Sequence, residues 1–190
     1  MVLVVIDGLD ASGKTTQALW LRSFMAGQQK TVCLRLHPSS DNVFGAKAKQ
    51  FLCCKGKNAH FAAALFYMVD VIRSVLLYSW RDYDYVIFVR YLMGTAYLPT
   101  PLDRIAYRFF STVVPTSDLM FFLDVTSAEA LRRLQARREK LEMFETVGGL
   151  EQTRRKAIFL TSLGGWKIIK AEGSAKEVHG AIRRSVEQGM

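Results

Sequence analysis

The sequence predicts an α/β fold in which a five-stranded parallel sheet carries helices on both faces. Five short apolar runs alternate with longer segments of helical periodicity, and four of the runs are almost continuously hydrophobic. Such strands are typical of a parallel sheet that is covered on both sides. The chain has 190 residues and shows no repeat or break in composition, so we expect one domain over residues 1–190.

The expected elements follow from hydrophobic spacing along the chain. The opening run at 2–7 is rich in Val and Ile and stops at Gly8, which favours a buried strand. Ala18, Leu21 and Met25 then recur at helical spacing. The same reasoning predicts strands at 2–7, 31–36, 85–89, 119–125 and 166–171. It predicts helices at 14–28, 43–52, 59–80, 104–113, 127–138, 150–163 and 174–188.

Residues that favour turns separate these elements. The segment 38–42 combines Pro, Ser, Asp and Asn and is expected to be a loop. The segment 92–103 contains two prolines and is expected to be irregular. Two adjacent glycines, Gly164 and Gly165, end the helix before the last strand. A charged stretch at 137–145 falls within an expected lid-like segment at about 137–149.

The formal charge of +9 is unevenly distributed and favours an anionic partner. Residues 1–130 carry 13 basic and 10 acidic side chains, whereas residues 131–190 carry 13 basic and 7 acidic ones. A positive C-terminal third suits small phosphates or nucleic acid. The excess charge shows neither interleaved aromatic residues nor a recognition motif, so no nucleic-acid partner is expected.

The cysteines and the hydrophobic runs indicate a cytoplasmic protein that does not use a membrane. Of three cysteines two are adjacent, which gives neither a disulfide framework nor the spacing of a zinc site. Reduced thiols are therefore expected. The longest apolar run, residues 61–69, ends at Asp70 and is far too short to span a bilayer.

One motif carries specific chemistry. Residues 8–15 fit the pattern G-x-x-x-x-G-K-[ST], between an expected strand and an expected helix. Backbone N–H groups of such a loop surround a phosphate, and the positive end of the helix dipole adds to the attraction. Lys14 would bridge the β- and γ-phosphates, and the Thr15 hydroxyl would ligate Mg²⁺. The residues expected at the nucleotide are Gly8, Leu9, Asp10, Ala11, Ser12, Gly13, Lys14, Thr15 and Thr16.

The phosphate loop identifies a nucleotide but not a reaction. The sequence contains no NKxD motif of the kind that reads guanine in GTPases. A small chain with the loop near its start and a basic stretch around 132–140 favours a small-molecule or nucleotide kinase. In such an enzyme the late arginines would neutralise charge in the transition state.

Further segments occur in an order that is typical of one family. They are Ile6–Gln17, Leu65–Tyr67, Arg90–Tyr91, Gly94–Tyr97, Phe122–Val125, Ala130–Arg133, Glu142–Glu145 and Trp166–Ala171. Together they resemble the thymidylate kinases, a branch of the nucleoside monophosphate kinases, over nearly the whole chain. The resemblance implies ATP as phosphoryl donor, Mg²⁺ as cofactor and dTMP as the small-molecule acceptor.

The resemblance also implies roles for individual residues. Candidate acceptor-binding residues are Asp10, Phe66, Tyr67, Asp70, Arg90 and Tyr97. Candidate catalytic residues are Lys14, Arg90, Arg137 and Arg138, the last two from the lid-like segment. Arg90 also follows a buried strand at the sheet edge where open α/β sheets bind ligands. Relatives pair through long apolar helices, which makes residues 59–80 the candidate surface of a homodimer.

Three departures from the family pattern bear on substrate choice. Val89 stands where the family has an aspartate that helps to organise magnesium, so Asp7 or Asp10 would have to substitute. Four residues after Phe66, Asp70 stands where the family has an arginine that binds the thymine carbonyl. Arginine only donates hydrogen bonds, whereas ionised aspartate only accepts them. The change therefore predicts that the base donates a hydrogen bond to position 70 instead of accepting one. The loop at 36–42 also lacks an expected arginine.

Three functional hypotheses therefore stay open on the sequence. The first is a nucleoside monophosphate kinase that acts on dTMP. The second is a P-loop kinase for another acceptor, such as one that carries an amino group opposite Asp70. The third is a nucleotide-binding homologue in which Val89 has impaired catalysis.

Overall fold

The computed structural model describes residues 1–52, 54, 57–136 and 146–189, and within them β1 is the central strand of a parallel sheet. The strand order is β2-β3-β1-β4-β5. The strands are β1 (Val2–Gly8), β2 (Val32–Leu36), β3 (Tyr85–Val89), β4 (Met120–Asp124) and β5 (Trp166–Lys170). Because all run the same way, their carboxyl ends meet at one edge of the sheet.

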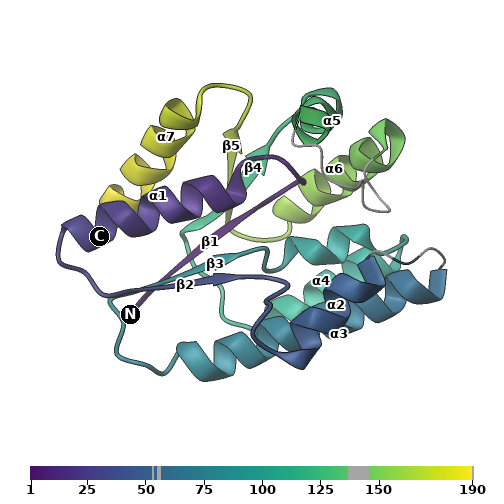
Figure 1. Cartoon of the computed structure of the whole chain (residues 1–190), viewed down its shortest axis with the longest axis horizontal. Helices are drawn as coiled ribbons and strands as arrows, with labels where there is room; N and C mark the ends of the chain where they lie inside the picture. The colour runs from purple at the N-terminus through teal and green to yellow at the C-terminus, as the bar shows by residue number, and fades with distance from the viewer. Residues whose placement is uncertain (53, 55–56, 137–145, 190) are drawn as a thin grey trace.

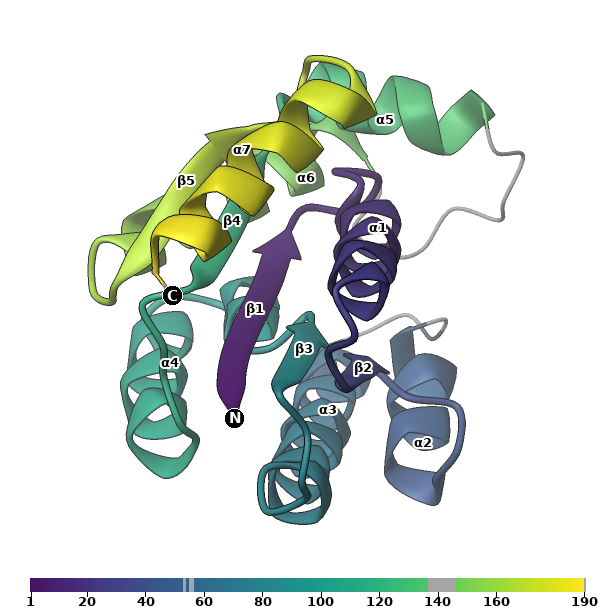
Figure 2. The ribbon, with the colours of Figure 1, turned by 90° about the vertical axis from the view of Figure 1, so that its left-hand side faces the viewer.

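Helices cover both faces of the sheet, as Figures 1 and 2 show. The helices are α1 (Lys14–Gly27), α2 (Val43–Leu52), α3 (Lys57–Tyr78), α4 (Leu102–Val113), α5 (Ser127–Ala136), α6 (Val147–Thr161) and α7 (Ala175–Gln188). A short 3-10 helix, η1 (Met93–Tyr97), follows β3. Helices α1 and α7 pack on one face, and α3, α4 and α6 pack on the other, with α2 against α3.

Alternation along each central strand divides its side chains between two cores. In β1, Val4 and Ile6 face α1 and α7, whereas Leu3 and Val5 face α3 and α4. Both sets are buried, which explains why the strand is an unbroken hydrophobic run. The apolar sequences of the strands therefore account for the burial of the sheet on both faces.

The apolar run expected to end at Asp70 continues beyond it, so that helix α3 is long and apolar enough to cross a membrane by length and composition, over Phe61–Tyr78. In this structure Tyr67, Val71 and Val75 belong to the buried core on the sheet. Apolar residues on its other faces are exposed, and they include Phe61 and Leu65. The helix thus has an inner face that covers the sheet and an outer apolar face.

The elements agree with the sequence-based expectations to within about three residues at each described boundary. The main difference is at 92–103, where an irregular segment was expected. It holds η1 and the start of α4, which begins directly after Pro101 because proline is compatible with a helix N-terminus. Helix α6 begins at Val147, so the end of the expected lid-like segment 137–149 is helical. Residues 137–145 lie outside the described residues.

Two neighbouring phenylalanines of α4 test the packing directly. Phe110 is 0% exposed in the core under the sheet, whereas Phe109 is 62% exposed. We expect Phe110→Ala to lower the free energy of unfolding by about 3–5 kcal/mol, because it removes buried surface and leaves a cavity. Phe109→Ala, the matched control, should change it by less than about 0.5 kcal/mol. Urea unfolding of both variants checks this, and equal losses would contradict the packing of α4.

Candidate active site

The segment between β1 and α1 forms an anion-binding loop. Gly8 and Gly13 have φ angles of +149° and +93°, which side-chain-bearing residues rarely adopt. A Cβ at Gly8 would lie 2.6 Å from the Leu123 carbonyl oxygen, so glycine is required there. Helix α1 begins at Lys14 with no side-chain cap and no acidic residue in its first turn. Its first N–H groups can therefore bind a phosphate.

The side chains of the loop fit a phosphate ligand. The Lys14 ammonium is buried and donates to the carbonyl oxygens of Gly8, at 2.9 Å, and Leu9. The buried Ser12 hydroxyl has no hydrogen-bond partner in the described part of the chain. The Thr15 side chain is on the exposed side of the first helical turn. The buried Ser12 hydroxyl is therefore expected to gain a hydrogen-bond partner when a ligand binds.

Asp10 connects the phosphate loop to the end of β3. One of its carboxylate oxygens accepts from the Arg90 guanidinium, and the other accepts from the Tyr97 hydroxyl at 3.0 Å. The Lys14 ammonium lies 3.9 Å away. Burial alone would raise the pKa of Asp10, but the Arg90 and Lys14 charges and these hydrogen bonds hold it below its usual value. Asp10 is therefore an ionised junction between three elements.

Asp7 fixes the segment after β3 to the end of β1. Its carboxylate accepts from the backbone N–H groups of Gly8 at 3.1 Å, Tyr91 at 2.8 Å and Met93 at 3.1 Å. Burial raises the pKa of Asp7 even though these N–H groups and Lys14 oppose the shift. Asp7 thus organises the backbone around the cavity.

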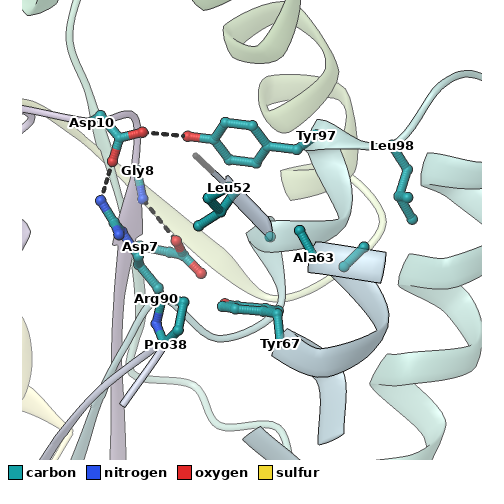
Figure 3. Close-up of a pocket in the computed structure, with 12 residues that line it drawn as sticks. Asp7, Gly8, Asp10, Pro38, Leu52, Ala63, Tyr67, Arg90, Tyr97 and Leu98 are labelled. Atoms are coloured by element: carbon teal, nitrogen blue, oxygen red, sulfur yellow. Dashed lines mark hydrogen bonds and ion pairs between the residues drawn. The ribbon is translucent and has the colours of Figure 1, made fainter. Parts of the chain in front are cut away.

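Arg90 leaves β3 in an unusual backbone conformation. Its φ of +57° lies in the left-handed region, which is uncommon for residues other than glycine. Its N–H donates to the Ile6 carbonyl at 3.2 Å. This turn directs the guanidinium to Asp10 at the carboxyl edge of the sheet, where Figure 3 shows the pair. The sequence-based expectation placed Arg90 at this edge.

A cavity lies next to the phosphate loop. Its lining residues are Asp7, Gly8, Asp10, Pro38, Leu52, Ala63, Ala64, Tyr67, Arg90, Gly94, Tyr97 and Leu98. Figure 3 shows that charged groups from β1 and β3 face it on one side and α3 faces it on the other. The cavity therefore has a charged end beside the phosphate loop and a largely apolar remainder.

Tyr67 and Gly94 form one wall of this cavity. The Tyr67 hydroxyl donates to the Tyr91 carbonyl at 3.1 Å, which fixes the ring. A Cβ at Gly94 would lie 2.4 Å from that ring, so a side chain at position 94 would displace it. The ring presents an aromatic surface on which a base can stack.

Phe66 was expected to stack on a base, and its position corrects that expectation. It packs in parallel on Phe51 of α2, with ring centroids 5.6 Å apart, and does not line the cavity. Residues one apart on a helix point about 100° away from each other. Since Ala63 and Tyr67 face the cavity, Phe66 faces α2 instead.

Asp70 was expected to contact the base, and the structure places it elsewhere. It is fully buried, and its carboxylate accepts from the Ser39 N–H at 2.7 Å and from Asn42 Nδ2 at 2.7 Å. The Ser39 hydroxyl donates as well. The Asp70 carboxylate therefore binds the loop after β2. It is not placed to accept a hydrogen bond from a base. Counted from Tyr67, the fourth residue is Val71, which lies in the core.

The two expected lid arginines, Arg137 and Arg138, lie outside the described residues. Sequence reasoning included Arg133 of α5 only within a group of late arginines and gave it no role of its own. Its guanidinium donates to Ala171 O at 3.0 Å and to Ala11 O at 3.4 Å, and it pairs with Glu129. Arg133 therefore places a cation next to the Ala11 carbonyl of the phosphate loop. The Glu129–Arg133 spacing of four residues was the available signal, but it indicates a helix salt bridge equally well.

The donor set suits magnesium that is bound mainly through phosphate. In the described part of the chain no three His, Cys, Asp or Glu side chains gather to hold a metal. The oxygens of Asp7 and Asp10 accept hydrogen bonds from protein groups, and Val89 offers no donor atom. Mg²⁺ commonly keeps several waters and binds through substrate phosphates. The exposed Thr15 hydroxyl beside the loop fits that mode of binding.

The fold and the site define a class of protein. A parallel sheet with a phosphate loop after its central strand, and a cavity beside that loop at the neighbouring strand, is the arrangement of a P-loop phosphotransferase. Residues 6–182 match the family model of thymidylate kinase. The chain belongs to the thymidylate kinase family.

Individual relatives agree with this assignment. A probable thymidylate kinase from Metallosphaera sedula is 32% identical over 170 residues, which cover 89% of this chain and 84% of the relative. A probable thymidylate kinase from Pyrobaculum calidifontis is 29% identical and is matched over 97% of its length and all of this chain. A solved structure of thymidylate kinase from Candida albicans superposes with a TM-score of 0.77 at 18% identity. It covers 99% of this chain and 92% of its own, which shows a common fold.

His37, which sequence reasoning also missed as a site residue, predicts a pH dependence of stability. Burial, reinforced by the Arg35 charge and opposed by Asp70, lowers the pKa of His37 from 6.5 to about 4. Between these values the unfolded chain binds a proton that the folded chain excludes, so stability falls as the pH falls. Between pH 7 and pH 4.5 the loss should be about 2 kcal/mol. Urea unfolding at pH 7 and pH 4.5 measures it.

The matched variant for this measurement is His37→Asn, which cannot titrate. The carboxylates shared by both proteins cancel when the two stability profiles are subtracted. The wild type should lose more stability than the variant on acidification. Parallel profiles would contradict a buried neutral His37.

Proposed function

We propose that this protein transfers the γ-phosphoryl group of ATP to the phosphate of dTMP, with Mg²⁺, to give ADP and dTDP. One observation carries the proposal: the phosphate loop and the adjacent cavity share the Asp10–Arg90 contact. A donor held by the loop and an acceptor held in the cavity would therefore meet at the same edge of the sheet. The two named archaeal relatives, each a probable thymidylate kinase, support dTMP as the acceptor.

Each residue takes a role that its position permits. Lys14 and the first N–H groups of α1 would bind the donor phosphates. Thr15 would hold Mg²⁺, which would offset the phosphate charge. Arg90 would bind the acceptor phosphate at the charged end of the cavity, and Tyr67 would stack on the base. Tyr97 would orient Asp10 near the acceptor sugar.

The reaction needs no general base, because the acceptor phosphate is already ionised. Catalysis then depends on positioning two anions in line and on neutralising their charge. Lys14 and Arg90 supply fixed cations in the described part of the site. Arg137 and Arg138 would add positive charge from the lid-like segment. The whole chain would act as one domain.

A coupled ADP-release assay over dTMP, dUMP, dCMP, dAMP and dGMP tests the proposed activity. The wild type should release ADP fastest with dTMP. Lys14→Ala should lower kcat/KM by at least about 100-fold, because it removes a preorganised charge at the transferred group. Lys30→Ala, at an exposed position after α1, is the matched control and should stay within about twofold. No ADP with any acceptor, or an active Lys14→Ala variant, would refute the proposed activity.

We also propose that two copies pair through the outer face of α3, and that the protein acts in the cytoplasm. Leu65, Leu76 and Trp80 are exposed along and just beyond this helix, and Trp80 is 84% exposed. Large exposed apolar patches mark interaction surfaces. The free thiols of Cys33 and Cys54 suit a reducing compartment.

Sedimentation of charged variants tests the pairing. Leu65 and Leu76 are eleven residues apart and lie on one face of α3, so Leu65→Asp with Leu76→Asp should convert a dimer to a monomer. Ile105→Asp, at an exposed position of α4, should leave the dimer intact. A monomeric wild type, or a dimer that survives the double substitution, would exclude this interface.

A further inference from the structure

We propose that His37 is a positioning residue for the acceptor site. Its imidazole ring holds the backbone at the end of β3 in the conformation that directs Arg90 into the cavity. The inference rests on the proposed function in one respect, the role of Arg90 at the acceptor phosphate. The contact itself depends only on the geometry of His37 and the end of β3.

The contacts of His37 converge on the last turn of β3. Its backbone N–H donates to the Val89 carbonyl at 3.0 Å. Its Nδ1 lies 3.1 Å from the Arg90 carbonyl oxygen and 3.3 Å from that of Val89. Carbonyl oxygens only accept, so Nδ1 must carry the proton. The neutral ring is therefore fixed in its Nδ1–H form.

Arg90 needs this support because its backbone conformation is unfavourable. A φ of +57° at an arginine persists only when the surroundings hold it. The Arg90 N–H is bound to the Ile6 carbonyl, and the Arg90 carbonyl is bound by His37. Both peptide groups that flank its Cα are thus anchored. Without His37 the second peptide group keeps the hydrogen bond from the Tyr91 N–H to Asp7 but loses the one to its carbonyl. The Arg90 carbonyl can then reorient, and the guanidinium is held less firmly toward Asp10.

The burial of His37 shows that its polar ring is retained at a cost. The residue is 3% exposed and packs edge-on against Phe88, with ring centroids 5.4 Å apart. Its Nε2 is buried and has no hydrogen-bond partner among the described residues. An apolar side chain would avoid this desolvation cost. The hydrogen bond from Nδ1 is the interaction that an apolar side chain would lose.

His37 also joins this turn to the segment after β2 that lines the cavity. The next residue, Pro38, lines the cavity, as does Arg90. Asp70 and Arg35 are the charged groups that act on the ring, and burial keeps it neutral near pH 7. The loss of the Nδ1 hydrogen bond should therefore weaken the binding of the acceptor phosphate. Donor binding at the phosphate loop should change little.

A double-mutant cycle with Arg90→Ala tests the coupling, with dTMP binding measured by calorimetry. His37→Leu should weaken dTMP binding about tenfold, the equivalent of one net hydrogen bond. In the Arg90→Ala background it should weaken binding by less than about twofold, because its effect passes through Arg90. Equal effects in both backgrounds, or no effect in either, would overturn the proposal.

Three comparisons separate positioning from a loss of structure. His37→Asn keeps an N–H donor close to the position of Nδ1 and should restore dTMP affinity to within about threefold of the wild type. Binding of a non-hydrolysable ATP analogue should stay within about twofold in every His37 variant. His179→Leu, on α7 and away from the cavity, is the matched histidine control and should bind dTMP like the wild type. Equal weakening of both ligands by His37→Leu would indicate a merely structural role and overturn the proposal.

The tautomer of His37 gives a test that needs no nucleotide. In protein labelled with ¹⁵N at histidine, the spectrum near pH 7 should show His37 protonated on Nδ1 alone, and His37→Asn assigns the signal. A proton on Nε2 would overturn the proposal even if the wild type phosphorylates dTMP. Failure of the wild type to bind dTMP would instead refute the proposed function. In that case the protonation of Nδ1 would still test the contact between His37 and the end of β3.

Discussion

The contact between Asp10 and Arg90 joins the phosphate loop to the neighbouring strand, and the arrangement of the site depends on it. The Arg90 guanidinium meets the Asp10 carboxylate across the carboxyl edge of β1 and β3, and Tyr97 completes the junction from η1. Asp10 is buried, whereas the Arg90 side chain is partly exposed, so removing Arg90 would leave a buried carboxylate with less compensating charge. Donor loop and acceptor cavity are therefore held in one relative position before any substrate binds.

That fixed position is what phosphoryl transfer requires. Two phosphates repel each other, and fixed cations can offset the repulsion without reorganising at the moment of reaction. Lys14 and Arg90 both lie nearest to the same Asp10 oxygen, so one carboxylate orders a cation of the phosphate loop and a cation of the acceptor cavity. The surrounding hydrogen bonds from Asp7 and His37 fix the backbone that carries Arg90.

The sequence predicted the sheet, the helices and the phosphate loop because each rests on local patterns, such as apolar runs and the spacing of Gly8, Gly13 and Lys14. The acceptor site was harder, since its walls come from segments far apart in the chain. Choosing between Phe66 and Tyr67 needs the rotation of α3, and the role of Asp70 needs the loop that supplies Ser39. The role of His37 could not be predicted, because the sequence does not show which carbonyl oxygens a single histidine contacts.

A crystal structure with a bisubstrate ligand, in which adenosine and thymidine are joined by a polyphosphate, would show whether the phosphate loop and the cavity form one active site. We expect the polyphosphate to bind the N–H groups of the phosphate loop, with Arg90 on the thymidine side. We expect the thymine ring to lie against Tyr67, between α3 and the end of β3. A thymidine bound outside this cavity, or a polyphosphate that does not enter the loop, would contradict this arrangement.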